Sequence, residues 1–301
     1  MVHEATKHAG ARFLVTVMAL VGAAIGAPAV AQNVVNAGNS AGDDDGALPL
    51  WELGAGAAAA YVPAYPGASA TQTRALPLPI VIYRGSFLRA GDGSLVSGKL
   101  IENDKLELDI SLNGSFNADS DDVAIRSGMP DLGFLFEIGP ELEWHLTPED
   151  SDRHWKLEFP VRAAFSVDDG DLNSRSWVFN PELELEMPGF FNPNDELSVA
   201  ISMAFAGESL MEYLYEVPNR FATPARPAFD AKAGYLGSQL SVSWSHRAKQ
   251  RFFIVGVAAT FLDGAENTTS PLVEERVNIS LFAAVAWSLI QSKRPAPKAR
   301  N

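Results

Sequence analysis

Apolar and polar residues alternate with a period of two along most of this chain. Residues 105–112 read KLELDISL, in which every second side chain is apolar, and the alternation returns in residues 134–146, 154–166 and 276–289. Successive side chains of a β-strand point to opposite faces, so the pattern predicts strands with one apolar and one polar face. No amphipathic helix of comparable strength competes with them, so we predict an all-β chain.

The predicted strands are unusually long. Most run for roughly nine to thirteen residues, whereas strands of globular proteins usually have about five or six. This length fits a tilted strand that crosses a bilayer. Backbone groups in lipid must all be hydrogen-bonded, so such strands close into a barrel with an apolar exterior and a polar interior. The predicted strands are residues 50–61, 74–83, 86–90, 94–102, 104–115, 132–146, 154–166, 175–187, 195–207, 229–246, 251–262 and 276–289.

The sequence therefore predicts a transmembrane antiparallel up-and-down β-barrel of about 12 strands, with 10 to 14 left open. The connections then alternate between long ones at the cell surface, such as residues 208–228, and short ones in the periplasm, such as residues 147–153. A soluble periplasmic β-sandwich also alternates. Strand length and an aromatic girdle at the strand ends argue against it. The girdle residues are Trp51, Tyr61, Tyr83, Trp144, Trp155, Phe165, Trp244 and Trp287.

Both ends of the chain lie outside the predicted barrel. Residues 1–31 have a basic start, an apolar run and a small-residue cleavage site, which predicts a signal peptide that is removed on export. Residues 32–48 are a polar, flexible lead-in, residues 49–290 form the barrel, and residues 291–301 are a basic disordered tail. We therefore place the protein in the outer membrane of a Gram-negative cell, in contact with lipid.

Composition narrows the function further. The formal net charge of −14 argues against a nucleic-acid partner. The chain has no cysteine, which excludes disulfides, thiolate metal sites and a lipidated N-terminal cysteine.

Several blocks of sequence resemble the MipA/OmpV family of outer-membrane proteins, named for the MltA-interacting protein. The blocks cover nearly all of the mature chain, and it is their combination that is specific. The chain departs from the usual barrel pattern at its end, because eleven residues follow the last strand instead of a terminal aromatic residue. The blocks are residues 50–90, 101–122, 126–133, 137–144, 226–240 and 270–289.

The resemblance implies an outer-membrane barrel. It also implies a scaffold between a murein-degrading lytic transglycosylase and a murein synthase, so these two enzymes are the expected protein partners. We expect no enzymatic activity and no cofactor. A narrow, cation-preferring channel for small solutes is the alternative function.

An acidic stretch and three histidines are the candidate sites of chemistry. The aspartates of residues 117–128 do not meet the EF-hand spacing, which requires Gly at position 6 and Glu at position 12. We therefore interpret the stretch as a solvated surface loop and predict no metal site. His145, His154 and His246 have no nucleophile marked beside them, so we predict no catalytic site.

Charged residues on the polar faces of the strands are the candidate functional residues. They carry both signs and come from neighbouring strands, so they can pair into networks that fill the lumen. The alternative is a narrow aqueous path lined by acid. The predicted lumen-facing residues are Lys105, Glu107, Asp109, Glu137, Glu141, Glu143, Lys156, Glu158, Arg162, Glu182, Glu184 and Glu186.

The longest connection, residues 208–228, is rich in aromatic residues and proline. It is either a contact patch at the surface or a segment that folds over the barrel mouth. As a patch it would present Tyr213, Tyr215, Arg220 and Phe221.

Overall fold

The computed structural model describes residues 49–84, 88–90, 97–98, 101–102, 105–148, 151–248 and 250–294. The predicted signal peptide and lead-in, residues 1–48, lie outside these residues. Residues 295–301 of the predicted tail also lie outside them.

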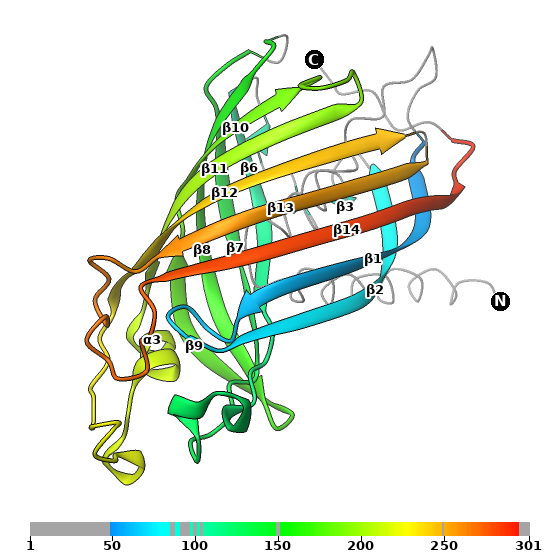
Figure 1. Cartoon of the computed structure of the whole chain (residues 1–301). Coiled ribbons are helices and arrows are strands. Elements are labelled where there is room, and N and C mark those ends of the chain that lie inside the picture. The colour runs from blue at the N-terminus through cyan, green and yellow to red at the C-terminus, as the bar shows by residue number, and fades with distance from the viewer. Residues whose placement is uncertain are drawn as a thin grey trace, which may run out of the picture.

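The described residues form one antiparallel sheet that closes into a barrel (Figure 1). β1 pairs with both β2 and β14, so the first and last strands of the chain are neighbours. At the other end of the pairing order, β4 contacts β6, which completes the ring. The strands are β1 (Trp51–Pro63), β2 (Thr71–Arg84), β3 (Leu88–Ala90), β4 (Ser97–Gly98), β5 (Ile101–Glu102), β6 (Leu106–Ser115), β7 (Phe134–His145), β8 (His154–Asp168), β9 (Asp171–Phe179), β10 (Glu182–Pro188), β11 (Asp195–Ala206), β12 (Gly234–Ala248), β13 (Arg251–Phe261) and β14 (Val277–Gln291).

Twelve barrel strands result from these segments. β4 pairs with β3 and β5 pairs with β6, so the two short segments share one position in the ring. β9 and β10 share another, because both pair with β8 on one side and β11 on the other. The structure confirms the predicted up-and-down barrel of about 12 strands.

The strand predicted at residues 175–187 is wrong in one respect, because it is interrupted. β9 ends at Phe179 and β10 begins at Glu182. Pro181 has no N–H to donate to the sheet, and the side chain of Asn180 donates instead to the carbonyl of Met203 at 2.8 Å. Backbone hydrogen bonds from Met203 to Pro181 and from Asn180 to Pro160 also cross this point, so the interruption is confined to the missing N–H of Pro181.

The two ends of the barrel differ. At the loop end, long connections follow β1, β6, β11 and β13; at the turn end, short connections follow β7, β10 and β12. The connection after β11 contains α3 (Glu208–Tyr215), an α-helix that the sequence analysis did not predict. Three short 3-10 helices are also described at the loop end: η1 (Ser120–Asp122), η2 (Ala124–Arg126) and η3 (Asn219–Phe221).

α3 forms because the start of residues 208–228 carries an apolar face at helical spacing. Leu210, Met211, Leu214 and Tyr215 are all buried on that face. Glu208 in the first turn complements the helix dipole. Of the helices in the part of the chain that the structure describes, none combines the length and apolar character needed to cross a membrane.

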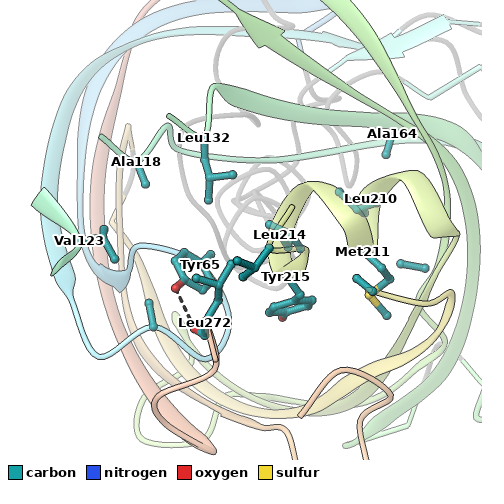
Figure 2. Packing of buried hydrophobic residues seen from close by; sticks show 14 of the residues in the cluster. Tyr65, Ala118, Val123, Leu132, Ala164, Leu210, Met211, Leu214, Tyr215 and Leu272 are labelled. Atoms are coloured by element: carbon teal, nitrogen blue, oxygen red, sulfur yellow. Dashed lines mark hydrogen bonds between the residues drawn. The ribbon is translucent and has the colours of Figure 1, made fainter. Parts of the chain in front are cut away.

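A hydrophobic core lies at the loop end, where we define the cap as the connections 64–70, 116–133, 207–233 and 262–276. Side chains from all four connections pack together and against inward-facing residues of β8, β9 and β11. Figure 2 shows α3 and Tyr65 inside the ring of strands rather than outside it. Each fully buried Leu or Met contributes about 1.5–3 kcal/mol to stability, so the cap is held firmly.

Candidate functional site in the barrel interior

Charged side chains lie on the inner face of β7, β8 and β10. On β8, Lys156, Glu158 and Arg162 are buried, whereas Trp155 and Val161 are exposed. Because strand residues alternate between faces, the charged set points inward and the apolar set points outward.

Lys156 is the centre of the first charge cluster. Its Nζ lies 2.9 Å from a carboxylate oxygen of Glu184 and 2.9 Å from one of Glu186. It also lies 3.3 Å from Glu158. Strand pairing brings these groups together, since Glu184 lies directly opposite Lys156 in the β8–β10 register. Three carboxylates share one ammonium, so this cluster is acidic as a whole.

Arg162 is the centre of the second cluster, nearer the loop end. Its Nη2 donates to Glu141 at 2.9 Å and its Nε donates to Ser111 at 2.8 Å. The contact between Arg162 Nη1 and Glu137 is longer, at 3.8 Å. Asn113 donates to the same carboxylate oxygen of Glu137 at 3.3 Å. Glu141 is therefore the close partner of Arg162, and Glu137 is only partly compensated.

A lateral row of carboxylates runs between the two clusters. Glu107 lies opposite Glu143, Glu143 opposite Glu158, and Glu158 opposite Glu182 in successive strand pairs. Like charges directly opposite each other destabilise a sheet, so the cations that flank this row on β8 are required to hold it. The register, which sequence alone does not reveal, assembles the row.

The remaining predicted lumen residues lie at the edge of this network. Asp109 is half-buried and lies opposite Glu141 in the β6–β7 register. Lys105 is exposed and lies just before β6, at the turn end.

The opposite wall of the barrel is apolar on its inner face, which corrects the expectation of a uniformly polar interior. We define the apolar wall as Ala58, Ala60, Phe252, Ile254 and Phe282, all of them buried. Residues 252–258 have no period-two polarity because both faces of β13 are apolar. This loss of alternation is the feature of the sequence that indicates an apolar inner face on β13. Small residues of β1 make room for the two phenylalanine rings.

A chamber lies between the charge clusters and the cap. Its volume is about 180 Å³, and residues of nine barrel strands line it together with α3. Leu210 and Leu214 of α3 and Tyr65 of the cap form its roof. Glu137 is the one charged residue among the lining residues that the structure describes. No local pattern of the sequence predicts this chamber, because strands far apart in the chain build it.

Long-range hydrogen bonds fix the cap above the chamber. Tyr65 donates to the carbonyl of Leu272 at 2.8 Å, shown as a dashed line in Figure 2. Tyr215 donates to the carbonyl of Pro66 at 2.9 Å. Burial raises the pKa of both tyrosine hydroxyls above their ordinary value, so both stay neutral donors.

Tyr213 joins the cap to the barrel wall. Its hydroxyl donates to Asp168 at 2.5 Å and accepts from the backbone N–H of Gly133 at 2.5 Å. The Arg175 guanidinium lies 3.9 Å from the centre of the Tyr213 ring and 2.7 Å from Asp168. We call Tyr213, Asp168 and Arg175 the latch, because they connect α3 to β8 and β9.

The four predicted surface contacts do not share one surface. Tyr215 as a surface contact is wrong: it is buried against Tyr65, since it lies on the inner face of α3. Tyr213 is half-buried in the latch. Arg220 is exposed, and its guanidinium lies 4.8 Å from the ring centre of the half-buried Phe221.

The acidic stretch is ordered by its own hydrogen bonds. Asp119 precedes η1 and accepts from the backbone N–H of Asp121 at 3.0 Å. Asp131 accepts from the N–H of Ser120 at 2.7 Å. Aspartates at the start of a short helix have this structural role without any metal.

His145, His154 and His246 all lie at the turn end of the barrel. His246 Nδ1 lies 2.5 Å from Asp195 Oδ1, and its ring stacks on Trp244. His145 lies 3.4 Å from Glu143, and His154 lies 4.0 Å from Glu186.

A closed barrel with an apolar exterior and a charged, capped interior defines an outer-membrane β-barrel protein. The chain belongs to the family described as MltA-interacting protein MipA, whose model matches residues 55–289. This match confirms the resemblance seen in the sequence blocks.

The solved structures that this chain resembles include three outer-membrane barrels, all of low similarity. The NanC porin has a TM-score of 0.35 and 10% identity, covering 79% of this chain and 100% of its own. The toluene transporter TbuX of Ralstonia pickettii has a TM-score of 0.27 and 11% identity, covering 83% and 71%. The outer-membrane protease OmpT of Escherichia coli has a TM-score of 0.24 and 8% identity, covering 79% and 94%. A comparison with curated protein sequences found no match.

Proposed function

We propose that this barrel is a non-enzymatic scaffold that holds a murein-degrading lytic transglycosylase, together with a murein synthase, at its turn end. Membership of a family described as MltA-interacting protein is the observation that carries the proposal. The capped interior supports it, because paired charges and the apolar wall occupy the lumen below the cap. The apolar exterior contacts outer-membrane lipid, and the turn end faces the periplasm.

The turn end offers an exposed aromatic contact site. Phe190 and Phe191 lie in the connection between β10 and β11, with 48% and 66% of their surfaces exposed. Their ring centres are 4.8 Å apart in a T-shaped arrangement. Lys293 and Arg294 are exposed at the same end, where the chain leaves β14 beside Trp51. Aromatic residues and arginine are enriched in protein interfaces, so these exposed groups fit a contact site at the turn end.

The test is a pull-down from detergent-solubilised envelopes. The wild-type barrel should recover a lytic transglycosylase and a murein synthase, and the double variant Phe190→Ser/Phe191→Ser should recover at least tenfold less. Leu172→Ser is the matched control, since Leu172 is as exposed but lies at the loop end on β9. Scaffolding is wrong if wild-type protein recovers neither enzyme. The contact site is wrong if the double variant recovers as much as the control.

A narrow, cation-preferring channel is the second candidate function. The observation that favours it is the excess of acid in the interior, where Glu107, Glu143, Glu158 and Glu182 form a row. Rings of carboxylates select cations in pores. Conductance in planar bilayers separates the two functions, because only a channel carries a current.

A further inference from the structure

We propose that the chamber under the cap is a binding site for a small amphipathic amine, with its ammonium group beside Glu137 and its apolar body beneath α3. This site is independent of the scaffolding role. The chamber lies within the barrel and does not include the turn end, where the murein enzymes are proposed to bind.

The size of the chamber limits the ligand to a small molecule. A volume of about 180 Å³ exceeds the roughly 150 Å³ of an engineered protein cavity that binds benzene. A ligand of about ten non-hydrogen atoms therefore fits, whereas a sugar chain or a peptide does not.

The lining has an apolar side and a polar side. Leu210, Leu214 and Leu132 contribute apolar surface at the cap. Ser202 and Thr260 contribute hydroxyl groups from the strands. An apolar ligand would leave the polar groups of the lining without hydrogen bonds. A fully polar ligand would place its own polar groups against the apolar lining, where they find no hydrogen-bond partner. The arrangement therefore selects an amphipathic ligand.

The charge of the site favours a cation. Glu137 lines the chamber, and Nη1 of its ion-pair partner Arg162 is 3.8 Å away. Arg162 is closer to Glu141, at 2.9 Å, so it does not fully neutralise Glu137. An ammonium group beside Glu137 would form the charge-assisted hydrogen bond that this carboxylate lacks.

Gln239 points to a second donor on the ligand. Its Nε2 donates to Thr260 at 3.1 Å, but its Oε1 is buried with no hydrogen-bond partner among the residues that the structure describes. Gln239 also lines the chamber. A buried acceptor without a partner destabilises the protein, and a ligand hydroxyl or N–H at this point would satisfy it.

The experiment uses tyramine as a probe, with the folded full barrel in nanodiscs and titration calorimetry as the readout. Tyramine carries an ammonium, an aromatic body and a hydroxyl donor. 4-Ethylphenol lacks the ammonium, and phenethylamine lacks the hydroxyl. We expect wild-type protein to bind tyramine more tightly than either of the two analogues.

Two variants assign the polar contacts. Glu137→Gln should weaken tyramine binding by roughly tenfold to a hundredfold and leave 4-ethylphenol binding unchanged, because only the charged hydrogen bond is lost. Gln239→Leu should weaken tyramine binding and leave phenethylamine binding unchanged. Glu212→Gln is the matched control, since Glu212 is exposed on the outer side of α3.

A third variant tests the chamber itself and does not depend on whether the two polar variants fold. Ala204→Leu fills the chamber from β11 and should abolish binding of all three probes. The proposal is overturned if tyramine does not bind wild-type protein at millimolar concentration. It is equally overturned if Glu137→Gln, with 4-ethylphenol binding intact, binds tyramine as tightly as wild type does.

Discussion

At the scale of single residues, Lys156 is the cation at the centre of the larger charge cluster of the interior. Its ammonium contacts Glu158, Glu184 and Glu186. Removing one partner of a buried ion pair costs about 3–5 kcal/mol, because the other charge is left without compensation.

We therefore expect Lys156→Met to lower the urea midpoint of unfolding in detergent by an amount equivalent to about 3–5 kcal/mol. Lys156→Arg keeps the charge and should cost much less. Arg251→Met, at the exposed start of β13, serves as the control for loss of a cation elsewhere. An unchanged midpoint for Lys156→Met would show that the cluster does not stabilise the barrel.

Gly256 is a second residue whose substitution should destabilise the barrel. A Cβ atom added there would lie 2.2 Å from the ring of Phe282, which packs over β13 in the apolar wall. Gly256→Ala should destabilise the barrel by about 1–3 kcal/mol, as overpacking does. Phe282→Leu should relieve most of that cost when the two changes are combined. A double-mutant cycle of unfolding free energies measures the coupling, and strictly additive effects would refute the contact.

At the scale of elements, the latch connects α3 to the barrel wall. Tyr213→Phe removes the hydrogen bonds to Asp168 and Gly133 but keeps the ring beneath Arg175. The loss is worth about 1–3 kcal/mol, so α3 should open roughly five- to a hundredfold more often.

Hydrogen–deuterium exchange of residues 208–215 measures this opening. The control is Tyr61→Phe, which removes a tyrosine hydroxyl from the exposed outer face of β1. Exchange at the wild-type rate in Tyr213→Phe would show that the latch does not hold the cap. Faster exchange is also expected to speed entry of a ligand into the chamber.

The elements also show which features the sequence could predict. Strand positions followed from local alternation, and the structure has β8 and β13 within two residues of the predicted limits. α3 was missed because its eight residues sit inside a connection rich in proline and aromatic residues. The break at Pro181 was missed because alternation continues across it.

At the scale of the whole molecule, side-chain orientation was predictable only where one face was polar. The inward glutamates of β7 and β10 could be identified from their alternation with apolar neighbours. The burial of Phe252 could not, because both faces of β13 are apolar and barrel closure decides which face points inward. The chamber and the burial of Tyr215 depend on contacts between connections that are far apart in the chain, which no local pattern encodes.

The closed interior makes a prediction about conductance. The cap covers the loop end, and the charge clusters and the apolar wall occupy the lumen below it. Ions cross such a barrel only if a continuous aqueous path exists. Wild-type protein in planar bilayers is therefore expected to be silent at neutral pH.

Replacing residues 208–228 with a short Gly/Ser linker tests the origin of that silence. It removes α3 and with it the part of the roof that α3 forms. Small, cation-preferring steps would then assign the silence to the cap, whereas continued silence would assign it to the charge clusters and the apolar wall. The control replaces only residues 219–226, which lie beyond α3, and should stay silent because Leu210 and Leu214 remain in place. Discrete steps in the wild-type protein would instead show that the cap does not close the barrel. They would favour the channel over the scaffold, because a conducting lumen is then a property of the native chain and not of its truncation.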